Sequence, residues 1–468
     1  MTYLFKMFSF YGRFYVIHQF FHLIWELIWS FLVSNSTIAS DGNDDNIVHG
    51  RIYRILWRSA WFDQDYHDLK NFLLIPSRLW STLTGHTDQY DDPNQIWTHP
   101  QWTLHGVNAS SVWFSRSPTD QDVLDIRQYP FVWYGQNTTA THILQLSHHD
   151  FWLWMEEQRI LSDYQPRVNT IFIWTSARAG STLLGQILAR VPHTKVISEP
   201  FSWAYLVGLR NKGMMSGQDE AFYVRALLLL TLKMEEERDP GVRHVVIKFP
   251  RMCTPQIGLV QRALPQGKHV FLSRQPDQSI GSWLRIAENL QRDQPLFYRF
   301  GLRPVVLNHI SLPYTPVRYR SLVERYRTQK WTLSLAEIFA LSYGGSIACL
   351  AQQRQLADMW LTYDELVNTD EIFTRCRVIT SLLEKCAIHE FDLPDLMDAF
   401  ESPSQKSLMN SRHVASSVGD SGQDSGARAP HEITNMVNGI FRDLQLPLTY
   451  HMSSKEFRAF IADFTMDA

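Results

Sequence analysis

The sequence predicts an α/β protein built on a parallel sheet that helices cover on both faces. After Pro166, short apolar runs alternate with longer stretches of helical periodicity. This alternation is typical of βαβ units, whose strands are buried on both faces. The chain has 468 residues, enough for two domains or for one enlarged α/β domain.

The elements of this sheet follow from the apolar runs and the segments between them. Five strands are predicted, at residues 170–174, 195–198, 244–249, 269–273 and 359–363. Helices are predicted between them, near residues 181–190, 221–237, 276–289 and 333–355.

We expect three parts along the chain. Residues 1–33 form a short tail and an apolar segment, residues 34–165 an irregular mixed α/β region that packs on the main domain, and residues 166–468 the main domain. Within the last part, residues 413–430 are rich in Ser, Gly and Asp and read as a surface loop.

The apolar segment at residues 14–33 is long enough, as a helix, to cross a membrane of about 30 Å. Lys6 and Arg13 precede it and acidic residues follow, which favours a single-pass type II signal anchor with the rest of the chain in the lumen. The alternative is an amphipathic helix on a membrane or on the protein, because a polar stripe recurs at His18, His22, Glu26 and Ser30.

Three N-glycosylation sequons follow this segment, at Asn35, Asn108 and Asn137, and favour a lumenal location. Lys and Arg together number 44 against 47 Asp and Glu, so the composition does not indicate a nucleic-acid partner. The four cysteines lack metal-ligand spacing, which leaves one or two disulfides open and predicts no metal site.

The run TSARAGST that follows the first predicted strand has the layout of a phosphate-binding loop, with a strand, a turn of small residues and a helix. Ser181 stands where a nucleoside triphosphatase of the Walker type carries its lysine. The loop therefore suits a terminal phosphate held by backbone N–H groups, hydroxyls and Arg178 better than it suits triphosphate chemistry with Mg²⁺. Taken alone, it can also be a strand-to-helix turn that binds nothing.

Two motifs together resemble the sulfotransferase superfamily, and in particular its Golgi carbohydrate branch. The run SARAGSTLLGQILARVPHTKVISEPF resembles the loop that binds the 5′-phosphosulfate of 3′-phosphoadenosine 5′-phosphosulfate (PAPS). The run SRQPDQSIGS resembles the second motif of that superfamily, which holds the 3′-phosphate. The resemblance covers approximately residues 168–383 and implies a Golgi membrane enzyme that transfers a sulfuryl group from PAPS to a hydroxyl, with a glycan as the expected acceptor.

The resemblance also implies the site residues. The donor is expected to contact the first loop and the second motif through Arg178, Ala179, Gly180, Ser181, Thr182, Arg274 and Ser282. Glu199, in the Glu-Pro position, is the expected general base, with a helix cap as the alternative. Apart from the resemblance, Lys248 follows an apolar strand at the expected sheet edge, so it is expected to stabilise the leaving group together with Arg178, and a solvated lysine at a strand end is the alternative.

The same residues leave two other functions open. One is a catalytically silent relative that binds a nucleotide or a glycan as a scaffold. The other is a P-loop kinase or NTPase, which the missing lysine disfavours.

Overall fold

The computed structural model describes residues 50–58, 72–84, 93–293, 334–367, 372–401 and 431–463. The predicted anchor, Asn35 and the predicted loop at residues 413–430 lie outside these ranges. No helix within the described ranges is long and apolar enough to span a membrane.

The parallel sheet predicted from the sequence is present, with strand order β10-β9-β6-β8-β7. Every neighbouring pair in it is parallel, and Ile173 of the central strand β6 pairs with Lys248 on one side and Val270 on the other. The α/β class is therefore confirmed. The strands are β6 (Asn169–Thr175), β7 (Thr194–Ser198), β8 (His244–Lys248), β9 (Lys268–Ser273) and β10 (Met359–Thr362).

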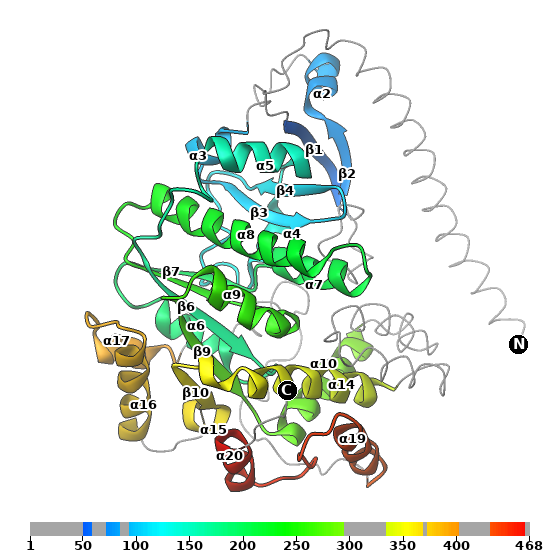
Figure 1. Ribbon diagram of the computed structural model, residues 1–468, viewed down its shortest axis with the longest axis vertical. Helices are drawn as coiled ribbons and strands as arrows, with labels where there is room; N and C mark the ends of the chain where they lie inside the picture. The colour runs from blue at the N-terminus through cyan, green and yellow to red at the C-terminus, as the bar shows by residue number, and fades with distance from the viewer. Residues whose placement is uncertain are drawn as a thin grey trace, which may run out of the picture. The chain divides into compact units, whose positions relative to one another are not determined.

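Helices cover both faces of this sheet (Figure 1). The alternate residues Ile171 and Ile173 belong to a core with α6 and α16, whereas Phe172 and Trp174 belong to a larger core with α7, α8 and α14. Burial on both faces explains why the strands read as continuous apolar runs. The helical elements after β6 are α6 (Ser181–Leu188), α7 (Ser202–Asn211), α8 (Gly217–Arg238), η3 (Arg251–Gln256), α9 (Ile257–Ala263), α10 (Pro276–Asp293), α14 (Leu335–Gln352), η6 (Arg354–Leu356), α15 (Tyr363–Leu366), α16 (Ile372–Lys385), α17 (Leu393–Asp398), α19 (His431–Asp443) and α20 (Ser454–Asp463).

A second, antiparallel sheet precedes the parallel one, in the region that was expected to be irregular. Its strand order is β2-β1-β5-β4-β3. All six residues of β3 and five of the six in β4 are buried, so polar residues of these strands, such as Thr103, His105 and Ser115, lie inside the protein and not on a solvent face. Its elements are β1 (Gly50–Arg58), β2 (Phe72–Pro76), α2 (Ser77–Thr84), α3 (Gln95–Thr98), β3 (Trp102–Val107), β4 (Ser111–Arg116), α4 (Val132–Thr139), β5 (His142–Ser147) and α5 (His148–Glu157).

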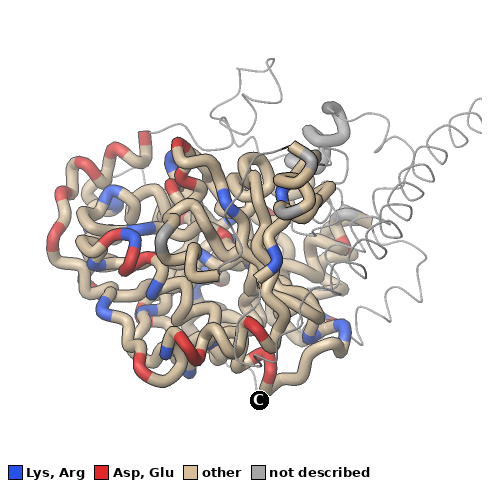
Figure 2. Tube along the Cα trace, turned by 90° about the horizontal axis from the view of Figure 1, so that it is seen from above, with Lys and Arg blue, Asp and Glu red and all other residues tan. Residues whose placement is uncertain are grey.

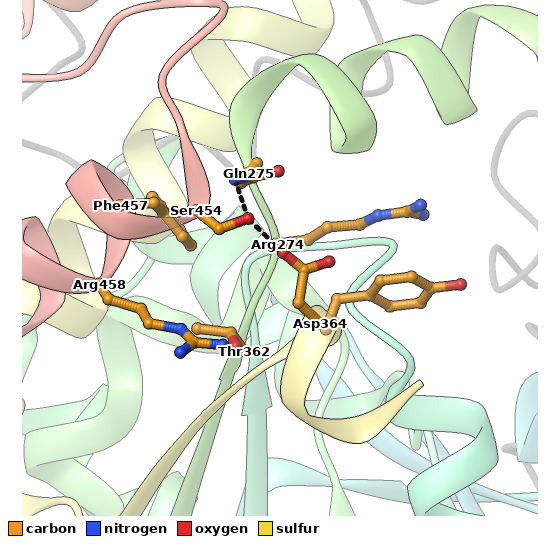
Figure 3. A pocket seen from close by; sticks show the side chains of 8 residues that line it. Arg274, Gln275, Thr362, Asp364, Ser454, Phe457 and Arg458 are labelled. Atoms are coloured by element: carbon orange, nitrogen blue, oxygen red, sulfur yellow. Dashed lines mark hydrogen bonds between the residues drawn. The ribbon is translucent and has the colours of Figure 1, made fainter. Parts of the chain in front are cut away.

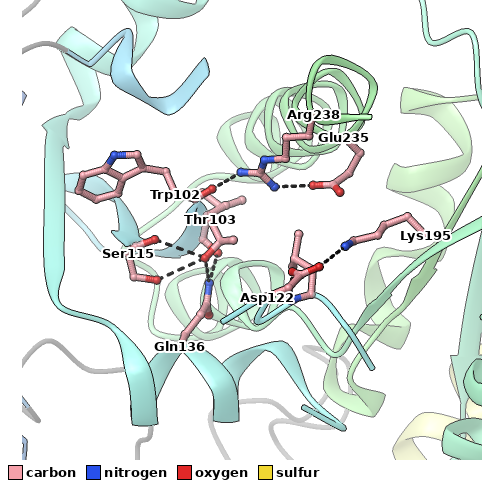
Figure 4. Close-up of polar contacts among 10 residues, drawn as sticks. Trp102, Thr103, Ser115, Asp122, Gln136, Lys195, Glu235 and Arg238 are labelled. Carbon is pink, nitrogen blue, oxygen red and sulfur yellow. Dashed lines mark hydrogen bonds and ion pairs between the residues drawn. The ribbon is translucent and has the colours of Figure 1, made fainter. Parts of the chain in front are cut away.

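Polar contacts join the region of the antiparallel sheet to the region of the parallel sheet (Figure 4). Arg238, at the end of α8, donates to the carbonyl of Trp102 on β3 and pairs with Glu235 at 2.6 Å. Lys195 of β7 pairs with Asp122 at 2.6 Å. Residues of both sheets also belong to one hydrophobic core.

All four cysteines are free thiols, so the one or two disulfides that the sequence left open are not formed. Cys253, Cys349 and Cys386 are buried, and burial raises the pKa of Cys386 to about 12. These thiols behave as small apolar side chains of the core.

Candidate functional site

Each strand of the parallel sheet supplies one polar residue at or just after its carboxyl end. Ligands of open α/β sheets bind outside this edge. From one side of the sheet to the other, the residues are Glu199 after β7, Lys248 at the end of β8, Arg178 after β6, Arg274 after β9 and Tyr363 after β10.

The loop between β6 and α6 has an unusual backbone. Ala177, Arg178 and Gly180 all have positive φ, at 84°, 55° and 83°. Non-glycine residues in this region cost on the order of 1–3 kcal/mol, and such strain clusters at ligand sites. A Cβ on Gly180 would lie 3.2 Å from Leu366 and 3.4 Å from Tyr363, so glycine also allows the close approach of α15.

The loop opens directly onto the N-terminus of α6. Gly180 is the N-cap of this helix, and no side chain caps its first turn. The helix dipole and the first-turn N–H groups therefore favour an anion at this point.

The two arginines of the two motifs converge on this loop. The Arg178 Nε donates to the Ser282 hydroxyl at 3.2 Å, and the Arg274 Nη1 donates to the carbonyl of Arg178 at 3.4 Å. Arg274 is 6% exposed and its guanidinium lies 3.7 Å from the centre of the Tyr363 ring, so it is held inside the protein and not in solvent.

Burial, and after it the charge of Arg274, lower the pKa of Arg178. No ion pair joins Arg178 to a carboxylate within the described ranges. Two cations held this close would be stabilised by a bound anion, so the donor set fits a phosphate.

Lys248 and Glu199 form a partly buried ion pair beside this loop. The Lys248 ammonium is fully buried and donates to Glu199 Oε1 at 2.9 Å, to the Thr182 hydroxyl at 3.2 Å and to the Ser198 hydroxyl at 3.4 Å. It also lies 4.8 Å from the centre of the Phe131 ring. The alternative reading of Lys248 as a solvated strand end is therefore wrong.

The structure also decides the alternative for Glu199. Phe201 is the N-cap of α7 and no side chain caps that helix, so Glu199 is not its capping residue. Glu199 instead has a positive φ of 52°, and its own N–H donates to the Lys248 carbonyl at 2.7 Å. Its side chain is 24% exposed, which leaves the carboxylate accessible while it holds the lysine.

Arg251 belongs to the same region, although the sequence analysis did not select it. It begins η3, just after β8, donates to the Ser342 hydroxyl and lies 5.1 Å from the centre of the Trp283 ring. Arg178 lies against the same ring at 6.0 Å. Burial lowers the pKa of Arg251 to about 10, while the charge of Glu199 opposes this shift.

The structure thus gathers the residues that the two motifs predicted. Lys and Arg are otherwise scattered over the described chain (Figure 2), whereas Arg178, Lys248, Arg251 and Arg274 all lie at one sheet edge. The described ranges contain no cluster of His, Cys, Asp or Glu arranged to hold a metal.

The fold and this edge define an α/β protein with basic side chains gathered at the carboxyl ends of its parallel strands, and the comparisons with known proteins add only distant likenesses. No family model matches the chain, and neither does any curated protein. Solved sulfotransferases overlap with it weakly. A sulfotransferase domain from the curacin biosynthetic pathway has 16% identity and a TM-score of 0.32, over 61% of this chain and 100% of that domain.

Two further likenesses are of the same kind. The sulfotransferase domain of the Synechococcus PCC 7002 olefin synthase has 17% identity and a TM-score of 0.31, over 61% of this chain and 98% of its own. Mouse sulfotransferase SULT7A1, solved with PAP, has 14% identity and a TM-score of 0.27, over 66% of this chain and 88% of its own. These values assign no family, so the function proposed below rests on the residues of the chain.

Proposed function

We propose that this protein is a sulfotransferase that moves a sulfuryl group from PAPS to a hydroxyl of an acceptor, which we take to be a glycan. The observation that carries the proposal is the convergence of two separate motifs on one sheet edge, where Arg178 and Arg274 flank a loop that lacks the Walker lysine. Two phosphate-binding groups side by side suit a nucleotide with phosphates at two positions.

Different residues would bind the two phosphate groups of the donor. The loop N–H groups at residues 178–182 and the Arg178 guanidinium would hold the 5′-phosphosulfate, and Arg274 with Ser282 would hold the 3′-phosphate. In the structure Ser282 accepts from Arg178, so it also orients that guanidinium. Bound PAPS would supply the sulfuryl group on an activated phosphosulfate bond.

The ion pair between Lys248 and Glu199 would orient the carboxylate that accepts the proton. Lys248 occupies Glu199 Oε1, so the other carboxylate oxygen, Oε2, is the one we assign to accept the proton of the acceptor hydroxyl. Lys248 also holds the Thr182 hydroxyl, which fixes the start of α6 relative to the base. In this arrangement Lys248 acts as a positioning group, and direct contact with the leaving group would require its ammonium to leave the pair.

We further propose that the chain is a lumenal Golgi membrane protein, held by residues 14–33 and modified with N-linked glycan. The support is the charge asymmetry around that segment and the sequon at Asn108, which lies at the turn between β3 and β4 beside the exposed residues Ala109 and Ser110.

The experiment that tests the reaction is transfer of labelled sulfate from PAPS to a panel of glycans, tyrosine peptides and small alcohols. We expect transfer to at least one class of acceptor. Binding of the donor product without any transfer would favour the silent scaffold. Protection from unfolding by ATP with Mg²⁺, but not by adenosine 3′,5′-bisphosphate, would favour a P-loop kinase or NTPase.

A binding measurement separates the two phosphate sites. Arg274→Ala should weaken the binding of adenosine 3′,5′-bisphosphate by about 2–3 kcal/mol, the value of a charge-assisted hydrogen bond, and leave adenosine 5′-phosphosulfate unchanged. Arg159→Ala, at a side chain that is 76% exposed, is the matched control and should affect neither ligand. Equal losses for both ligands in Arg274→Ala would mean that Arg274 is structural.

A further inference from the structure

A continuous chain of hydrogen bonds joins Arg274 to the C-terminal helix α20. The Arg274 Nε donates to Gln278 Oε1 at 3.0 Å, and Gln278 Nε2 donates to Gln275 Oε1 at 2.6 Å. Gln275 Nε2 then donates to the Ser454 hydroxyl at 2.7 Å, and that hydroxyl donates to Asp364 Oδ2 at 2.7 Å. Figure 3 shows the last two of these bonds.

All four bonds of this relay run in the same direction, from a cation to an anion. Each amide accepts with its oxygen and donates with its nitrogen, and the Ser454 hydroxyl accepts one bond and donates the next. Bonds aligned in this way polarise one another, and the loss of one member weakens the others. Ser454 is the only member that comes from α20, since the others lie on α10, just before it, or on α15.

Hydrogen bonds at two nitrogens restrain the orientation of the Arg274 guanidinium: Nε donates to Gln278, which begins the relay, and Nη1 donates to the carbonyl of Arg178 at 3.4 Å. The Tyr343 hydroxyl donates to the Arg274 carbonyl at 2.7 Å, which holds the backbone. Tyr363 stacks on the guanidinium, and a stacked guanidinium can still turn in its own plane. The hydrogen bond at Nε is the shorter of the two, at 3.0 Å, and it restrains that rotation and with it the direction of the other N–H groups of the guanidinium.

We propose that Ser454, through this relay, is a positioning residue for the phosphate site at Arg274, so that α20 is part of the machinery that recognises the 3′-phosphate. This rests on the proposed function, in which Arg274 binds that phosphate. It assigns a role to a C-terminal helix about 180 residues away in sequence from Arg274. By thermodynamic linkage, binding of a 3′-phosphate must stabilise the docking of α20 as much as that docking strengthens the binding.

The chain offers a matched control at the neighbouring serine. Ser453 caps the first turn of α20 through reciprocal bonds with Glu456 and has no place in the relay. Ser453→Ala therefore weakens the same end of the same helix by the same chemical change, whereas Ser454→Ala removes the link to Gln275 and Asp364. Ser454→Thr keeps the hydroxyl and should behave as the unchanged protein.

The test is the affinity of the full chain and these three variants for adenosine 3′,5′-bisphosphate and for adenosine 5′-phosphosulfate. We expect Ser454→Ala to weaken bisphosphate binding about fivefold, the value of one hydrogen bond, and to leave the 5′-phosphosulfate within about twofold. Ser453→Ala and Ser454→Thr should keep both affinities. In hydrogen exchange, the bisphosphate should slow the amides of α20, and the 5′-phosphosulfate should not.

The outcomes separate the inference from the proposed function. If the unchanged protein binds the bisphosphate and Ser454→Ala weakens both nucleotides equally, or no more than Ser453→Ala does, the relay is only structural and the inference is wrong. If the unchanged protein binds neither nucleotide, the proposed function is wrong and the inference falls with it.

Discussion

The ion pair between Lys248 and Glu199 should respond unequally to the loss of either partner. The Lys248 side chain is fully buried, whereas the Glu199 side chain is 24% exposed. Glu199→Gln leaves an ammonium that water cannot reach, although the new amide oxygen can still accept one hydrogen bond from it. Lys248→Met leaves a carboxylate that water can reach and fills most of the lysine volume.

The structure sets the expected magnitudes. Removing one partner of a buried pair costs about 3–5 kcal/mol, and the retained hydrogen bond places Glu199→Gln near the lower end, at about 3 kcal/mol. Because the orphaned Glu199 can be hydrated, Lys248→Met should cost about 1 kcal/mol. The double variant should cost less than the two single changes together, since it leaves no unpaired charge.

Urea unfolding followed by tryptophan fluorescence measures these costs, through the midpoint and the slope of each transition. Asp163→Asn is the matched control, because it makes the same change of carboxylate to amide in the exposed pair with Arg159 and should cost less than about 0.5 kcal/mol. The reasoning is refuted if Glu199→Gln is as mild as this control, or if Lys248→Met is as costly as Glu199→Gln.

The stability of Glu199→Gln also affects how its rate of sulfate transfer is interpreted. In the role of general base proposed for it, Glu199 takes the proton of the acceptor, so Glu199→Gln should lower the rate of sulfate transfer about 10²- to 10⁴-fold. Rates must therefore be measured at temperatures where the variant is folded, so that lost stability is not taken for lost catalysis.

Two further predictions concern pH and glycosylation. His269 is buried and its Nδ1 accepts from Trp174 Nε1 at 3.0 Å, and burial lowers its pKa from 6.5 to about 4. The unfolded chain therefore binds a proton at His269 between pH 6.5 and pH 4 that the folded chain does not, so the contribution of His269 to the free energy of unfolding should be constant above this window and fall by about 3 kcal/mol across it. Melting temperatures across this range should fall less for His269→Gln, and parallel curves for the two proteins would contradict the assignment. For glycosylation, Asn137 lies within the helix α4, whereas Asn108 lies at the turn between β3 and β4, so in animal cells and in a background with Asn35→Gln, Asn108→Gln should abolish a glycosidase-sensitive mobility shift and Asn137→Gln should not. A shift that persists in Asn108→Gln and disappears in Asn137→Gln would reverse this conclusion.

The parallel sheet and the residues at its edge could be predicted because their signals are local. Strands buried on both faces leave uninterrupted apolar runs, and the loop after β6 carries its small residues in sequence. The antiparallel sheet could not be predicted, since β3 and β4 contain His, Ser and Thr at buried positions, so the polarity of their residues does not report which side chains are buried.

The partners of the site residues were not predictable either, because they depend on strand order. Lys248 and Glu199 meet only because β7 and β8 are neighbours, although α7 and α8 separate those strands in sequence. Arg251 lies in a short 3₁₀ turn that carries no periodic signal. The bond between Ser454 and Asp364 spans 90 residues, which no local pattern reports.

The hydrophobic core that the two sheets share limits which fragments of the chain can fold alone. Trp102 and Phe114 of the antiparallel sheet belong to the same core as Trp174 and Trp203 of the parallel part. A fragment that begins at Pro166 would therefore expose apolar faces of α7 and α8 to water, and such patches promote aggregation. The described chain from β1 to α20 should melt in one cooperative transition, so the smallest piece able to fold and remain dispersed should include the antiparallel sheet.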